Sequence, residues 1–208
     1  MSPRELLERG VALLGMGAPE GASDRLLAYV DLLAKWNRTY NLTAIRDPRE
    51  MVSHHLLDSL AVRPHLPEGA LADVGSGGGL PGIPLAIVEP ERRVTLNDAN
   101  QKKAAFLRQA IIELRLANAD VHEGQVQSWH ASPRFACVIT RGFSELARFI
   151  AACRHLVAPG GVLAAMKGTF PRQELDRLRG DVDCRDVRRL SVPFVDAERH
   201  LVLCRCAA

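Results

Sequence analysis

Apolar residues in the first third of the chain recur every three or four positions, as they do along one face of an α-helix. A first helix is predicted to begin after Ser2, where the sequence matches a capping box. A second is predicted along the apolar stripe of residues 26–36, followed by an irregular connection over 37–46. A third is predicted over residues 47–62. We therefore expect residues 1–66 to form a helical N-terminal extension.

From residue 71 onward, short apolar runs alternate with amphipathic helical segments. This alternation predicts a mainly parallel sheet with helices on both faces. Strands are expected at 71–74, 93–98, 120–122, 135–141 and 161–167, with a closing pair near 187–192 and 200–206. Helices are expected at 100–116, 143–157 and 171–179. The predicted fold class is α/β, with a Rossmann-like seven-stranded sheet in residues 67–208.

A glycine-rich turn joins the first predicted strand to the helix after it. Glycine fills four of the five positions from 75 to 79, which leaves the backbone open to a closely approaching ligand. The spacing of Gly77, Gly79 and Gly82 also matches a dinucleotide fingerprint, so a nicotinamide cofactor is one reading. Asp73, just before the turn, favours instead a ligand with a cationic or amine end. S-adenosylmethionine carries both a sulfonium and an α-amino group.

Ligands of doubly wound sheets bind beyond the carboxyl ends of the strands. The residues that the sequence places there are Asp73, Asp98, Val126 with Gln127, Arg141 and Lys167. Asp98 could accept hydrogen bonds from two ribose hydroxyls, or cap the helix that begins near residue 100, and both roles can coexist. These strand ends are expected to converge on one crevice.

Two histidines and a carboxylate stand out in the third predicted helix. His54 and His55 each share a helical face with Asp58, so either could hydrogen-bond to it. We expect a partly buried structural histidine there, because two ligands are too few for a metal site. No metal is expected elsewhere in the chain.

The composition indicates the class of protein and its expected cellular location. The chain has 208 residues, 47% hydrophobic and 25% charged, as in a soluble globular protein, and its net charge of +3 suits a nucleic-acid partner. No apolar stretch could span a bilayer and no signal peptide is visible, so no membrane partner and a cytoplasmic location are expected. The five cysteines are scattered, which predicts neither a disulfide framework nor a zinc site, and most are expected to be small buried hydrophobes.

Five motifs spread over nearly the whole chain carry a family resemblance. They are WNRTYNLTAIRDP at 36–48, HLLDS at 55–59, DVGSGGGLPGIP at 73–84, VITRGF at 138–143 and ERHL at 198–201. Together they closely resemble the bacterial small-subunit rRNA methyltransferase G family, also called glucose-inhibited division protein B. The resemblance implies a class I S-adenosylmethionine-dependent methyltransferase fold and methylation of N7 of one guanine in 16S rRNA. The implied partner is 16S rRNA or the small ribosomal subunit.

The resemblance also implies roles for single residues. Joined with the argument from strand ends, it predicts these cofactor contacts: Asp73, Gly75, Gly77, Gly79, Leu80, Asp98, Val126, Gln127 and Arg141. Residues predicted to face the RNA are Lys167, Arg199 and His55, and those predicted to serve the chemistry are Arg141, Lys167 and Phe143. The chain departs from the family's pattern at Asn97 and Gln127, so adenine and ribose contacts are expected to differ in detail, and Thr140 replaces the family's fourth-strand serine, a mild change.

The chemistry expected from these residues needs no general base, because guanine N7 already presents a lone pair at neutral pH. Thr140-Arg141-Gly142-Phe143 stands where amine methyltransferases carry an Asn/Asp-Pro-Pro-Tyr motif, which argues against methylation of an exocyclic amine. Phe143 could stack on the target base or pack the helix that it begins. Arg141 fits the cofactor's carboxylate or an RNA phosphate better than a place beside a sulfonium.

Two other functions stay open at this point. One is an NAD(P)-dependent oxidoreductase, which the glycine spacing would allow, and the other is a non-catalytic rRNA-binding assembly factor. The chain is expected to be monomeric.

Overall fold

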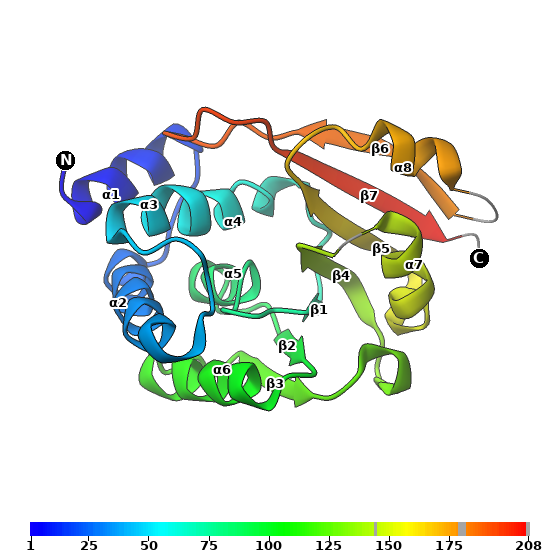
Figure 1. The fold of residues 1–208 in the computed structure, drawn as a ribbon, viewed down its shortest axis with the longest axis horizontal. Helices are drawn as coiled ribbons and strands as arrows, with labels where there is room; N and C mark the ends of the chain where they lie inside the picture. The colour runs from blue at the N-terminus through cyan, green and yellow to red at the C-terminus, as the bar shows by residue number, and fades with distance from the viewer. Residues whose placement is uncertain (144, 179–181, 207–208) are drawn as a thin grey trace.

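The computed structural model describes residues 1–143, 145–178 and 182–206, and its centre is a seven-stranded sheet in the order β3-β2-β1-β4-β5-β7-β6 (Figure 1). The strands are β1 (Leu71–Val74), β2 (Val94–Asp98), β3 (Ala119–Glu123), β4 (Phe135–Arg141), β5 (Val157–Lys167), β6 (Val182–Arg189) and β7 (His200–Cys206). β7 pairs antiparallel with β5 and β6, and the other pairings are parallel. The predicted fold class is confirmed, although β6 begins and ends earlier than the predicted strand.

The N-terminal helices lie together on one side of the molecule (Figure 1). They are α1 (Pro3–Leu13), α2 (Ala22–Tyr40), α3 (Pro48–Met51), a π-helical segment (Val52–Leu57) and α4 (Asp58–Leu60). The capping box is confirmed, since the Ser2 hydroxyl accepts from the Glu5 amide and the Glu5 carboxylate accepts from the Ser2 amide. The irregular connection was predicted to begin at residue 37, but helix α2 continues to Tyr40. Asn41, with a φ of 50°, caps its C-terminal end.

The remaining helices alternate with the strands. They are α5 (Gly82–Val88), α6 (Gln101–Glu113), α7 (Leu146–Cys153) and α8 (Arg172–Arg177), with 3₁₀ turns at Arg63–His65, Val126–Ser128 and Arg154–Leu156. Helix α7 is shorter than predicted, because β5 already begins at Val157. Arg179, the end of the last predicted helix, lies outside the described residues. No helix in the described ranges is long and apolar enough to cross a membrane.

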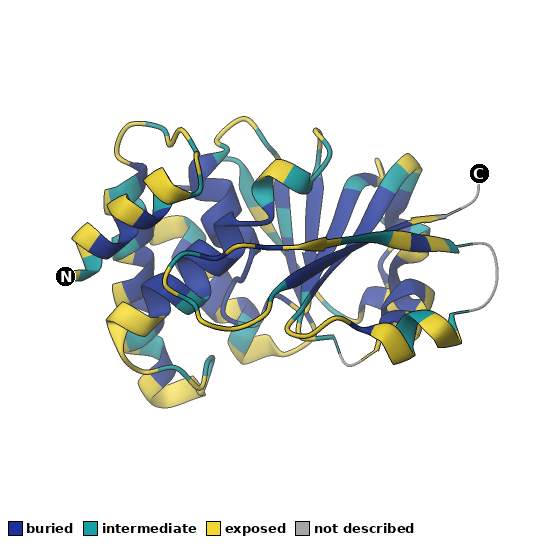
Figure 2. Cartoon of the chain, turned by 90° about the horizontal axis from the view of Figure 1, so that it is seen from above, coloured by how far each residue is buried: buried dark blue, intermediate teal, exposed yellow. Residues whose placement is uncertain are grey.

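Alternate strand residues build two hydrophobic clusters on opposite faces of the sheet. Leu71 and Ile139 pack with α5, α6 and the extension, whereas Ala72 and Val138 pack with α7. Figure 2 shows the strands as a buried layer between helices with exposed outer faces. Because residues of the extension belong to the first cluster, the hydrophobic core is continuous across position 66, and the division into two domains there stays a prediction.

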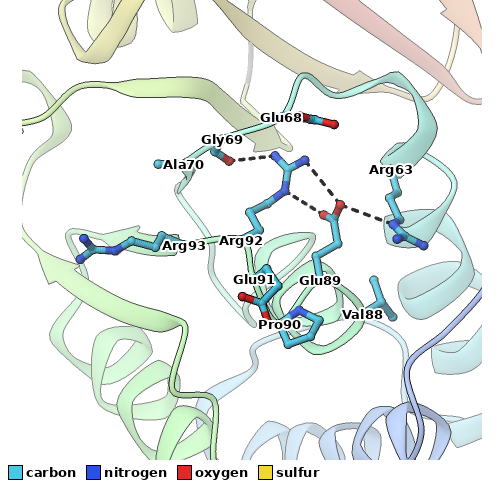
Figure 3. Close-up of a pocket in the computed structure, with 10 residues that line it drawn as sticks. All are labelled: Arg63, Glu68, Gly69, Ala70, Val88, Glu89, Pro90, Glu91, Arg92 and Arg93. Atoms are coloured by element: carbon cyan, nitrogen blue, oxygen red, sulfur yellow. Dashed lines mark hydrogen bonds and ion pairs between the residues drawn. The ribbon is translucent and has the colours of Figure 1, made fainter.

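Ion pairs at the amino ends of β1 and β2 tie the extension to the sheet domain (Figure 3). Glu89 pairs with Arg63 of the extension at 3.4 Å and with Arg92 at 2.9 Å, and Arg92 also donates to the Gly69 carbonyl. The surrounding pocket, about 460 Å³, is lined by three arginines and three glutamates: Arg63, Arg92, Arg93, Glu68, Glu89 and Glu91. Its charges balance, so we assign it a structural role.

One disulfide corrects the expectation from cysteine spacing. Cys184 of β6 and Cys204 of β7 are bonded, because the antiparallel register brings them side by side. Contact across strands depends on register, which the spacing along the chain does not reveal. Cys137 and Cys153 are buried free thiols, as predicted, and burial raises the pKa of each to about 12. The side chain of Cys206 lies outside the described part of the chain.

Candidate functional site

The glycine-rich loop turns the chain from the end of β1 into α5. The Ser76 hydroxyl donates to the Asp73 carbonyl at 2.8 Å, and its amide donates to the Asn97 carbonyl of β2 at 2.9 Å. Gly75, Gly77 and Gly79 have φ values of 67°, 57° and 85°, a region that side chains disfavour. The tight turn itself therefore explains part of the glycine content.

The glycines of the loop divide into two groups. A Cβ on the exposed Gly75 would meet nothing within 4 Å, and one on Gly77 would meet only a backbone oxygen at 3.9 Å. A Cβ on Gly79 would instead collide with Ile83, and one on Gly82 with Leu96 and Asp73. Gly75 and Gly77 thus leave room for a ligand, while Gly79 and Gly82 are required by packing.

Asp98 fastens the loop to the end of β2. One carboxylate oxygen accepts from the Gly77 amide at 3.0 Å, and the other accepts from the Asn100 amide at 2.9 Å. The helix-cap reading for Asp98 is wrong, because the Asn100 side chain caps α6. Each carboxylate oxygen keeps a second lone pair, so a ribose contact stays a prediction for Asp98.

Asp73 is fully buried beneath the loop. Its Oδ2 accepts from the Gly82 amide at 2.9 Å, and its Oδ1 has no hydrogen-bond partner among the described residues. Burial raises the pKa of Asp73 to about 6, against the opposing effect of the Gly82 hydrogen bond. At neutral pH a buried negative charge therefore lies under the crevice, which fits a cofactor with a sulfonium and an ammonium group.

The extension holds the loop from the other side. The hydroxyl of Tyr29, a fully buried residue of α2, donates to the Gly78 carbonyl, and the Leu33 side chain lies where a Cβ on Gly78 would point. Sequence reasoning assigned Tyr29 only to the core stripe of α2. A tyrosine among leucines gives no sign of which backbone group its hydroxyl will meet.

Tyr29→Phe should weaken S-adenosylmethionine binding by about 3- to 10-fold, because the buried Gly78 carbonyl would lose its partner at a cost of about 1 kcal/mol. Isothermal titration calorimetry measures the change. Tyr40→Phe is the matched control, since Tyr40 ends the same helix, is 40% exposed, and contacts Trp36 through its ring. Equal affinities for the two variants would contradict a role for Tyr29 in holding the loop.

Two residues predicted to contact the cofactor follow the carboxyl end of β3. Val126 and Gln127 form the 3₁₀ turn that follows β3, with Val126 buried and Gln127 exposed. Thr140 of β4 donates its hydroxyl to the Val74 carbonyl at 2.8 Å, which fixes the ends of β1 and β4 to each other. The predicted cofactor contacts of Leu80, Gly79, Val126 and Gln127 stay predictions.

A second hollow of about 610 Å³ lies between the extension and the carboxyl ends of β4 and β5. Its lining includes the residues predicted for chemistry and RNA contact: His55, Arg141, Phe143, Lys167 and Arg199. Asp58 and Glu174 line the same hollow and supply its carboxylates. We call this hollow the basic pocket. Of the strand-end residues expected in one crevice, Arg141 and Lys167 line the basic pocket, whereas Asp73, Asp98, Val126 and Gln127 are not among its lining residues.

The cations of the basic pocket are paired with its carboxylates. Asp58 accepts from Arg199 Nε at 2.9 Å and from Arg141 Nη1 at 3.4 Å. Lys167 Nζ lies 2.9 and 3.0 Å from the two oxygens of Glu174, which also accepts from the Leu146 amide at the start of α7. These side chains are therefore held in fixed positions.

His55 is a structural histidine, as predicted. It is buried, and its Nε2 lies 2.8 Å from the Thr43 hydroxyl. Burial and the nearby Arg141 lower the pKa of His55 to about 4, so the ring is neutral at neutral pH. The predicted hydrogen bond to Asp58 is absent from the described contacts, because Asp58 faces the two arginines instead. RNA contact by His55 stays a prediction.

Phe143 precedes α7 without beginning it. Its ring lies 5.6 Å from that of Phe149 in α7, so the packing role is confirmed. It also lines the basic pocket, which leaves stacking on a base as a prediction.

Comparison with known proteins gives a consistent answer. A family profile described as "rRNA small subunit methyltransferase G" matches residues 22–202. A Neisseria meningitidis serogroup C protein named "Ribosomal RNA small subunit methyltransferase G" is 52% identical over 99% of both chains, and a Methylobacillus flagellatus protein of the same name is 50% identical over 96% of both.

Solved structures agree on the fold. "DhpI-SAH complex structure" superposes with a TM-score of 0.57 at 19% identity and covers 89% of this chain and 97% of that one. The glycopeptide N-methyltransferase MtfA superposes with a TM-score of 0.59 at 14% identity, over 74% of this chain and 96% of that one. At such identities the likeness shows the class I methyltransferase fold alone.

These findings confirm the resemblance found in the sequence motifs and the predicted enzyme class, with S-adenosylmethionine as cofactor. The profile spans both the glycine-rich loop and the basic pocket, and the relatives align along nearly the full chain. The chain belongs to the rRNA small subunit methyltransferase G family.

Proposed function

We propose that this protein methylates N7 of one guanine in 16S rRNA, as a monomer in the cytoplasm, on the free RNA or the assembled small subunit. The choice of N7 rests on one observation: among the described residues that line the basic pocket, both carboxylates are held in ion pairs. Asp58 is bound to two arginines and Glu174 to Lys167, so neither is placed to remove a proton. An exocyclic amine or a ribose hydroxyl must lose a proton on methylation, whereas N7 loses none.

The cofactor supplies an electrophilic methyl group on a sulfonium, and the protein's residues supply position. Gly75 and Gly77 leave the backbone accessible at the end of β1, and Asp98 holds the loop in that shape. Arg141 and Phe143 line the basic pocket, where Arg141 would donate to a guanine carbonyl or a phosphate and Phe143 would cover the face of a base. Such positioning is worth up to roughly 7 to 11 kcal/mol in favourable cases.

The alternative functions gain no support from the comparisons. An NAD(P)-dependent oxidoreductase rested on the glycine spacing alone, and Gly79 and Gly82 are explained by packing. A non-catalytic assembly factor does not agree with membership of a methyltransferase family.

Incubation of unmodified small subunits, or of 16S rRNA, with methyl-labelled cofactor should give one N7-methylguanine. That base makes the RNA cleavable after reduction and aniline treatment, and primer extension then maps the position. At saturating S-adenosylmethionine the rate should show no acid-side limb near neutral pH, because the pKa of His55 is about 4 and N7 needs no general base. Label on an exocyclic amine or a ribose, in RNA that resists cleavage, would refute the N7 assignment.

A further inference from the structure

We propose that Asp58 is a positioning residue of the basic pocket: its carboxylate, supplied by the N-terminal extension, holds Arg141 and Arg199 in place and offsets one of their two positive charges. The inference rests on the proposed function, because it concerns how the pocket accepts a base that becomes cationic. It gives the extension a part in the reaction itself.

Asp58 joins two arginines that are far away in the sequence. Arg141 ends β4 and lies 83 residues further along the chain, and Arg199 precedes β7 and lies 141 residues further. Backbone carbonyls complete the arrangement, since His54 O accepts from Arg141 at 3.3 Å and Glu198 O accepts from Arg199 at 2.8 Å. Arg141 Nη1 also lies 3.4 Å from His55 Nδ1, so Arg141 is held by three groups and Arg199 by two.

Asp58 is more deeply buried than the two arginines that it binds. The Asp58 side chain is 5% exposed, whereas those of Arg141 and Arg199 are 25% and 23% exposed. The carboxylate is thus more buried than the arginines, and both arginine side chains line the pocket. Because solvent screens a buried carboxylate less than an exposed one, Asp58 fixes both arginines more firmly than an exposed ion pair would.

The backbone of the extension is shaped for these contacts. Residues Val52–Leu57 form a π-helical segment between α3 and α4, where the hydrophobic pattern had predicted ordinary helix. The segment ends beside Asp58, and its His54 carbonyl receives the Arg141 hydrogen bond. π-helical turns occur often at functional sites. This one presents a carbonyl and a carboxylate to the same guanidinium.

The charge of the pocket matters for transfer to N7. In that step the N7 lone pair forms the new carbon–nitrogen bond, and the carbon–sulfur bond electrons go to sulfur. The total charge is unchanged, but the positive charge moves from sulfur to the purine. Three cations and two carboxylates line the pocket, a net charge of +1 with its three histidines counted as neutral, and loss of Asp58 would raise this charge to +2. The added positive charge would oppose the arriving one.

Asp58→Asn should lower kcat by about 10- to 100-fold while leaving KM for the RNA substrate unchanged or lower. Two released arginines and one extra positive charge favour binding to RNA phosphates, so binding should not suffer. Steady-state kinetics with small subunits and labelled S-adenosylmethionine give both constants. Asp31→Asn, the same change at an exposed position of α2, is the matched control and should match wild type.

The outcomes separate the two hypotheses. A wild-type protein that places no methyl on N7 refutes the proposed function. If the wild type methylates N7 and the kcat of Asp58→Asn is unchanged, only the role of Asp58 is overturned. This holds also if the variant has a raised KM at that unchanged kcat. Should Asp58→Asn be unfolded at the assay temperature, Asp58→Glu keeps the charge. A kcat within about 10-fold of wild type for Asp58→Glu is then expected, and a larger loss would overturn the inference.

Discussion

Replacing Gly75 with valine should abolish S-adenosylmethionine binding in a protein that still folds, with a loss of at least about 100-fold in affinity, or about 3 kcal/mol. Gly75 is the exposed glycine at the end of β1, and a Cβ built on it points into open space. That space is where the backbone must admit the cofactor. A Cβ there meets no atom of the surrounding protein within 4 Å, and the branches of valine would occupy the space beyond it. Calorimetric titration with S-adenosylmethionine measures the loss.

Backbone strain is the competing explanation, because Gly75 has a φ of 67° and valine disfavours positive φ. Gly15→Val provides a matched control. Gly15, in the turn after α1, has a φ of 65°, and a Cβ there also meets nothing within 4 Å. Both variants should lose similar stability in thermal unfolding, and only Gly75→Val should lose cofactor affinity. Comparable cofactor binding by the two would place the ligand elsewhere.

The sheet and its strand ends could be predicted because local patterns determine them. Most of the predicted strands contain a short apolar run, and parallel strands place their carboxyl ends at one edge whatever the details of packing. For that reason Arg141 and Lys167 were expected in one crevice with no knowledge of their contacts. The motif at residues 73–84 contributed to the family resemblance for a related reason: the turn requires glycine at fixed positions.

The partners of polar side chains could not be predicted, because they depend on tertiary contacts. Asp58 and His55 share a helix, so sequence reasoning paired them with each other, yet Asp58 binds arginines from β4 and from just before β7. The Cys184–Cys204 bond depends on strand register in the same way. The different roles of Gly75 and Gly79 likewise depend on which side chains surround them.

In the wild type, ionisation of Asp73 should lower the free energy of unfolding by up to about 3 kcal/mol as the pH rises, and Asp73→Asn should remove this dependence. The carboxyl pKa is raised from 3.8 to about 6 by burial, so the folded state holds its proton more tightly than the unfolded chain. The stabilisation is therefore complete below about pH 4 and is lost as the pH rises through about 6, at about 1.4 kcal/mol per unit of pKa difference. Urea unfolding of the cofactor-free protein between about pH 4 and 8 measures the slope. The variant should lack this fall, and Asp31→Asn should retain it.

Ionisation of Asp73 should also affect cofactor binding, where it should raise affinity although it lowers stability. Ionisation of Asp73 places a negative charge under a crevice that is to receive a sulfonium and an ammonium group, so affinity for S-adenosylmethionine should rise from about pH 5 to 7. S-adenosylhomocysteine lacks the sulfonium and should show a weaker rise. In Asp73→Asn the affinity should no longer vary over this range, since asparagine does not ionise. Parallel pH profiles for the wild type and Asp73→Asn, in stability and in binding, would mean that Asp73 serves only to hold the Gly82 amide.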